Sequence, residues 1–73
     1  MSDIYEEKRR FVENHVGPML VAASEGDVCK VIYDEYVDEE IVNVVFASGH
    51  VKHVCVTGDS LKAIVQDVLK VFD

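Results

Sequence analysis

The sequence predicts a small α+β domain in which one helix precedes three strands and another follows them (α-β-β-β-α). Apolar residues recur at helical spacing near both ends of the chain, and the middle is rich in valine. Two short turn-forming stretches divide that middle into three pieces. We therefore expect a three-stranded antiparallel meander with both helices packed on one face. With 73 residues, the chain is long enough for a single domain spanning residues 1–73.

The first helix is expected to begin at Asp3, because Asp3 followed by Glu6 is similar to a capping box. Gly17-Pro18 should interrupt this helix, since proline lacks a backbone N–H and disfavours helix at the preceding residue. Met19 to Ser24 should form a kinked continuation or a second short helix, ended by Gly26. The expected apolar face comprises Ile4, Phe11, Val12, His15 and Val16.

The strands are expected at residues 28–37, 41–47 and 51–57. The chain has fifteen valines and only three leucines, and most of the valines lie between residues 28 and 56. Asp38-Glu39 and Ala47-Ser48-Gly49 supply the turns, with Gly49 suited to a positive φ.

These turn lengths determine which side chains share a face of the sheet. A slip of one residue in either turn would exchange the two faces. The face that the helices should cover comprises Cys29, Val31, Tyr33, Val42, Val44, Phe46, Val54 and Val56. The opposite, half-apolar face comprises Lys30, Ile32, Asp34, Tyr36, Ile41, Asn43, Val45, Val51, His53 and Cys55.

The second helix is expected at residues 60–72. Asp59 or Ser60 would cap it, because a short side-chain oxygen can accept from the free N–H groups of the first turn. Its apolar stripe follows the i, i+3, i+4, i+7 pattern and comprises Leu61, Ile64, Val65, Val68, Leu69 and Phe72.

Charge and length exclude several classes of function. A formal net charge of −7 disfavours direct binding to nucleic acid or to an anionic membrane. The longest apolar run, Met19 to Ala23, is far shorter than a membrane span, and the first residues do not resemble a secretory signal. We therefore expect a cytoplasmic protein whose two cysteines stay reduced.

Five acids, Asp34, Glu35, Asp38, Glu39 and Glu40, gather at the first hairpin without a basic residue among them. The simplest interpretation is a soluble turn whose charges discourage edge pairing. The alternative is a negatively charged prong that binds a basic groove in place of phosphates, with Tyr33 or Tyr36 as an apolar anchor. A calcium site is disfavoured, because the loop lacks the glycine and ligand spacing of an EF-hand.

Other reactive residues favour structural roles. Cys29, His50, His53 and Cys55 are the residue types of a zinc site, but the register should place the two cysteines on opposite faces. A core cysteine and surface histidines are therefore expected, with no metal and no cofactor, although a metal-binding regulator using His50, His53 and a cysteine stays an alternative. His53 beside Cys55 lacks a pocket, so no enzyme is expected. Thr57-Gly58-Asp59-Ser60 suits helix capping, and Lys8-Arg9-Arg10 suits a solvated helical face.

The uncovered sheet face is a second candidate surface. Ile32, Tyr36, Ile41, Val45 and Val51 would form an exposed apolar patch there, with His53 beside it. Such a patch predicts an interface. A structural homodimer or a small regulatory subunit assembled through this face is thus the alternative to binding through the hairpin.

The α-β-β-β-α layout is shared with double-stranded-RNA-binding domains. Those domains begin their last helix with lysines that contact phosphates, whereas this chain has Gly58-Asp59-Ser60-Leu61-Lys62-Ala63, so that function is set aside. In layout, size and charge the chain resembles the small acidic anti-CRISPR proteins of phages, without a diagnostic motif. The resemblance implies a phage-encoded inhibitor that works in the host cytoplasm and occupies a basic nucleic-acid-binding cleft of a partner such as a Cas nuclease. The hairpin from Asp34 to Glu40 would make the contacts.

Overall fold

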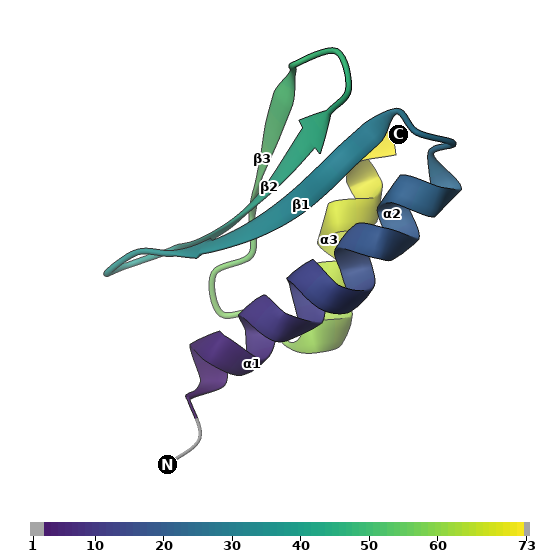
Figure 1. The fold of residues 1–73 in the computed structure, drawn as a ribbon. Helices are drawn as coiled ribbons and strands as arrows, with labels where there is room; N and C mark the ends of the chain where they lie inside the picture. Colours follow the sequence, from purple (N-terminus) through teal and green to yellow (C-terminus); the bar gives the residue numbers. More distant parts are fainter. Residues whose placement is uncertain (1–2, 73) are drawn as a thin grey trace.

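The computed structural model describes residues 3–72 and has the predicted α+β fold (Figure 1). A helical stretch comes first, then an antiparallel sheet in the order β1-β2-β3, then a closing helix. The helical elements are α1 (Ile4–Phe11), the π-helical turn η1 (Val12–Val16), α2 (Gly17–Ala23), α3 (Leu61–Leu69) and the 3-10 turn η2 (Lys70–Phe72). The strands are β1 (Val28–Glu35), β2 (Glu40–Phe46) and β3 (Val51–Cys55).

The N-terminal helical stretch continues past Gly17-Pro18 without a break in helical structure, but η1 interrupts its α-helical bonding. A second short helix, α2, then follows as expected. Asp3 caps α1 as predicted, its side chain accepting from the N–H groups of Tyr5 and Glu6. The π-helical turn shifts the bonding to i→i−5, with the Gly17 N–H donating to the Val12 carbonyl, and Pro18 lies in the first turn of α2. Gly17 allows a close approach to the sheet, because a Cβ there would lie 3.5 Å from the Val31 Cβ.

The register of the sheet confirms the predicted faces except at Cys29. Val31 pairs with Val44 and Tyr33 with Val42, as the turn lengths imply. A β-bulge between Val28 and Lys30 inserts one extra residue, so Val28 is buried and Cys29 is exposed. The prediction of a core cysteine is therefore wrong.

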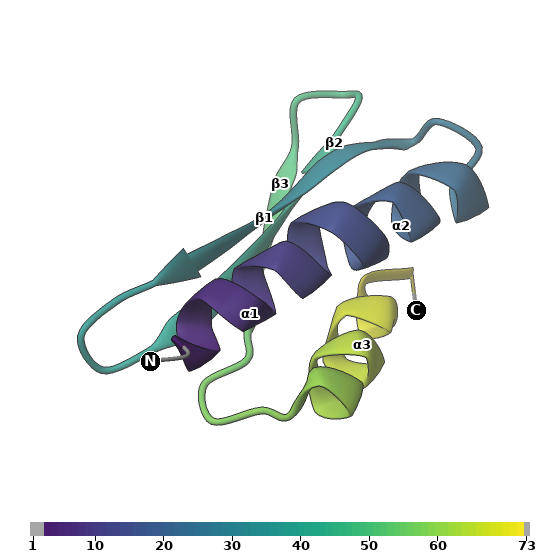
Figure 2. The same ribbon diagram turned by 60° about the horizontal axis from the view of Figure 1, so that its bottom comes forward.

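The N-terminal helical stretch and α3 both lie on one face of the sheet, and no helix within residues 3–72 covers the other face (Figures 1 and 2). The N-terminal helical stretch packs mainly along β1, while α3 contacts β3. Ser60 caps α3 by accepting from the Ala63 N–H, and Gly49 has the predicted positive φ of 94°. No helix among residues 3–72 is long and apolar enough to cross a membrane. The core comprises Val12, Val16, Leu20, Val28, Val31, Tyr33, Val42, Val44, Val56, Ile64 and Val68.

Candidate partner-binding surfaces

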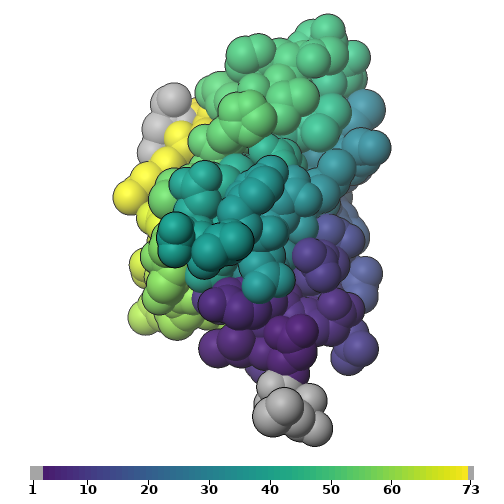
Figure 3. All heavy atoms as spheres, turned by 90° about the vertical axis from the view of Figure 1, so that its left-hand side faces the viewer, coloured from purple at the N-terminus to yellow at the C-terminus, as the bar shows by residue number. Residues whose placement is uncertain are grey.

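The β1–β2 hairpin extends beyond the described start of α1 (Figures 1 and 2), and its end faces the viewer in Figure 3. Its tip carries acidic and apolar residues. Its turn closes through the Tyr36 N–H, which donates to the Glu39 carbonyl at 2.7 Å. Tyr36 is 56% exposed and Val37 is 99% exposed, so neither side chain contributes to the core. We call the exposed residues Glu35, Tyr36, Val37, Asp38 and Glu39 the hairpin tip.

Two of the five acids assigned to the hairpin are not part of this tip. Asp34 is half-buried and accepts from the Asn43 side-chain amide on β2. Glu40 is only 6% exposed and faces inward, so its assignment to the partner-contacting surface is wrong. The hairpin turn places Glu40 opposite Glu35 at the start of β2, and the alternation of the strand then directs its side chain to the helix-covered face.

Glu40 is the centre of a buried polar network. Its Oε1 accepts from Lys8 Nζ at 2.8 Å and from the Tyr33 hydroxyl at 2.6 Å, and its Oε2 accepts from the Gly58 N–H at 2.9 Å. The Glu40 N–H in turn donates to the Thr57 hydroxyl. This network joins α1, β1, β2 and the loop before α3, so it fixes the base of the hairpin against the helices.

The network changes the ionisation of its members. Burial alone would raise the pKa of Glu40, but hydrogen bonds from Lys8, Tyr33 and Gly58 outweigh it and lower that pKa. Burial, and then the hydrogen bond to the Glu40 carboxylate, raise the pKa of Tyr33 far above its usual value. Glu40 is therefore held as a carboxylate and Tyr33 as a neutral phenol.

The basic cluster on α1 is only partly solvated. Arg9 and Arg10 both pair with Glu6 on the helix surface, at 3.2 and 3.6 Å. Lys8 is buried, so its expected place on a solvated face is wrong. Glu13, one turn after Arg9, accepts from the backbone N–H of Tyr33 on β1.

The uncovered sheet face combines an apolar hollow with a polar chain across the three strands. The Asn43 amide donates to Asp34 on β1, and its oxygen contacts Nδ1 of His53 on β3. Asn43 thereby orients His53, and the sequence alone did not identify Asn43 as the partner of this histidine. The hollow has a volume of about 550 Å³ and is lined by Ile32, Tyr36, Glu39, Ile41, Asn43, Val45, Val51 and His53.

The cysteines and histidines do not come together. Cys29 and Cys55 are both exposed, one at the bulge in β1 and the other at the end of β3. Cys55 Sγ contacts the Thr57 hydroxyl rather than His53. Within residues 3–72, no three His, Cys, Asp or Glu side chains are grouped closely enough to hold a metal ion.

Comparison with protein-family models, curated proteins and solved structures found no match for this chain. Its surfaces must therefore be interpreted from their own chemistry. Sequence reasoning missed two residues that define the hairpin, Lys8 and Val37. Lys8 could have been found from its spacing, because it lies four residues before the buried Val12 and therefore on the same side of the N-terminal helical stretch.

Proposed function

We propose that this protein is a non-enzymatic inhibitor that inserts the hairpin tip into a basic, nucleic-acid-binding cleft of a protein partner. The resemblance to acidic anti-CRISPR proteins makes a Cas nuclease the first partner to test. The observation that carries the proposal is the composition of the tip: Glu35, Asp38 and Glu39 surround the exposed Tyr36 and Val37.

The tip has the features of a protein-binding hot spot. An exposed tyrosine and a fully exposed valine supply apolar area that the fold itself does not use. The carboxylates around them would pair with cations that otherwise hold phosphates, and the net charge of −7 would steer the protein toward such a cleft. The buried Glu40 network holds the hairpin in place, which lowers the entropic cost of binding.

The experiment is a displacement assay with a panel of purified Cas nucleases and fluorescent target duplex. The protein should displace the duplex from at least one nuclease, and more weakly as salt increases. The test variant is Asp38→Lys with Glu39→Lys, which leaves the buried Glu40 intact. It should weaken binding by about a hundredfold or more, since reversing interfacial charges costs several kcal/mol.

A matched control reverses two acids elsewhere on the surface. Glu7→Lys with Asp27→Lys changes the net charge equally but lies outside the tip, and both positions are exposed. Equal losses for the two double variants would mean that only net charge matters. No displacement from any nuclease, or full activity of the tip variant, would refute the proposal.

A second candidate function is assembly of a homodimer through the uncovered sheet face. It is favoured by the hollow over β1, β2 and β3, where Ile32, Ile41 and Val45 are only half-buried and no helix of the described residues covers them. Light scattering should then detect a dimer that Val45→Lys dissociates. A monomer at all concentrations would dismiss this candidate.

A further inference from the structure

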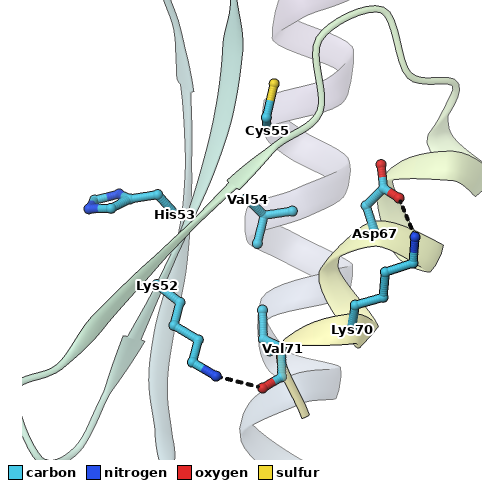
Figure 4. A pocket seen from close by; sticks show the side chains of 7 residues that line it. All are labelled: Lys52, His53, Val54, Cys55, Asp67, Lys70 and Val71. Carbon is cyan, nitrogen blue, oxygen red and sulfur yellow. Dashed lines mark hydrogen bonds and ion pairs between the residues drawn. The ribbon is translucent and has the colours of Figure 1, made fainter. Parts of the chain in front are cut away.

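We propose that the free edge of β3 is a second binding site, which accepts an extended peptide strand carrying an acidic and an apolar side chain. The site includes the backbone edge of β3 and the adjoining groove between β3 and α3 (Figure 4). It is separate from the hairpin tip and does not depend on the function proposed for that tip.

The two edges of the sheet differ in their backbone hydrogen bonding. At the β1 edge, Glu13 accepts from the outward Tyr33 N–H at 3.2 Å and so closes part of that edge. At the β3 edge, the sheet order leaves no neighbouring strand within the described residues. An open strand edge is a template for a further strand.

The free groups on β3 follow from its pairing with β2. The Val56 N–H donates to the Glu40 carbonyl, and the Phe46 N–H donates to the His50 carbonyl, so even-numbered residues direct their backbone groups to β2. In an antiparallel pair this direction alternates along the strand. The N–H and C=O groups of Val51, His53 and Cys55 therefore point to the open edge, and all three residues are exposed.

General spacings indicate that two helices side by side are wider than three strands. Two helices side by side need about 20 Å, at about 10 Å each, whereas three strands spaced about 4.8 Å apart provide about 14 Å. The difference is about the width of one strand. At the β3 edge, a groove of about 520 Å³ lies between β3 on one side and α3 with η2 on the other.

The lining of the groove defines the chemistry of the strand that would fill it. Val54 and Val71 form its floor, and an apolar side chain of the added strand would cover them (Figure 4). Lys52 donates to the Val71 carbonyl at 3.0 Å and has no carboxylate partner among the described residues, whereas Lys70 pairs with Asp67 at 3.5 Å. The groove is thus locally basic on an acidic protein, and favours an acidic side chain next to the apolar one.

A second copy of this chain fits the edge less well than a single strand does. Pairing of two β3 strands about a twofold axis would bring both α3 helices, each of which contacts its own β3, close to the same seam. It would also join two bodies of net charge −7. A single peptide strand would instead widen the sheet by one strand and leave α3 in place.

The test uses the whole protein and a display library of random linear peptides about twelve residues long, enough to span β3 at about 3.3 Å per residue. Enriched peptides should alternate, with acidic and apolar residues two positions apart. When a synthetic copy of the most enriched peptide is added, amide hydrogen exchange measured by NMR should slow about tenfold or more at Val51, His53 and Cys55. The amides of Lys52 and Val54, which already face β2, should change little.

Matched substitutions separate backbone pairing from side-chain binding. His53→Pro removes one outward N–H without removing a bond to β2, and proline is tolerated at such edge positions. It should weaken binding by at least about tenfold, whereas His53→Ala, which loses the same side chain, should bind like the native protein. Lys52→Glu should weaken binding of the acidic peptide, and the Asp38→Lys, Glu39→Lys variant should retain it.

Four results would overturn this inference. The first is that no peptide is enriched from the library, and the second is that the most enriched peptide protects other amides instead. The third is equal peptide binding by His53→Pro and His53→Ala. The fourth is that self-association protects the amides of the β3 edge before any peptide is added. Because the hairpin tip is untouched in the His53 pair, failure here leaves the displacement assay above to be judged separately.

Discussion

Replacing Lys8 with methionine should lower the free energy of unfolding by about 3 kcal/mol, because it leaves the Glu40 carboxylate buried without its cation. The two side chains are 8% and 7% exposed and their charged atoms lie 2.8 Å apart, so solvent screens the pair only weakly. We expect the lower end of the known range, since methionine keeps the helix propensity and most of the apolar stem, and Tyr33 and Gly58 still donate to the carboxylate.

That loss is a large part of the total for a chain of this size, which should be about 4–11 kcal/mol. Urea unfolding followed by far-ultraviolet circular dichroism would measure it. The double variant with Glu40→Gln should recover much of the loss, because a neutral amide needs no buried cation. A coupling energy below about 0.5 kcal/mol between Lys8 and Glu40 would refute this reasoning.

The same network predicts a dependence on pH. Because the pKa of Glu40 is lowered in the folded protein, its stabilising contribution is complete above the unfolded value of 4.5 and is lost as pH falls through the folded pKa. Lys8→Met should make the free energy of unfolding depend less steeply on pH in this acid range. An unchanged pH dependence in the variant would indicate that other carboxylates determine it.

Three further predictions concern other side chains. The pKa of Tyr33 is raised, so its stabilising contribution is complete below pH 10 and is lost at higher pH; Tyr33→Phe should abolish the last tyrosine step in an ultraviolet titration. The pKa of Asp59 is raised, first by its hydrogen bond with Asp67 and then by burial. Asp59→Asn should therefore raise the midpoint temperature of unfolding at neutral pH, and a lower midpoint would refute this prediction. Cys29 and Cys55 are both exposed, so both should react with a thiol reagent in the native protein; a thiol that reacts only after unfolding would contradict the bulge in β1.

The sequence was sufficient for the α+β layout because the periodicity of its apolar residues differs so clearly between the ends and the middle. The valine alternation in β2 and the turn at Gly49 then determined the register of β2 against β3. Cys29 was misplaced because a β-bulge adds one residue without leaving a signature in the composition. Local rules predict each element, but not the irregularity that accompanies the burial of Val28.

The site could be predicted less well than the fold. Glu40 was grouped with its acidic neighbours by proximity in sequence, yet Lys8, its partner, is 32 residues away and belongs to another element. The interruption expected at Gly17-Pro18 takes the form of a π-helical turn, after which α2 begins, and only the fold shows that Gly17 lies close to Val31. Long-range partners decide which charged residues are available to bind.

The central claim is that the hairpin tip binds a basic cleft, and the most direct measurement is the dissociation constant for a Cas nuclease at low and at high salt. The native protein should bind strongly at low salt and lose affinity steeply as salt increases. The Asp38→Lys, Glu39→Lys variant should be about a hundredfold weaker at low salt, with a shallower salt dependence than the Glu7→Lys, Asp27→Lys control. Equal affinities and equal salt slopes for the two variants would contradict the claim.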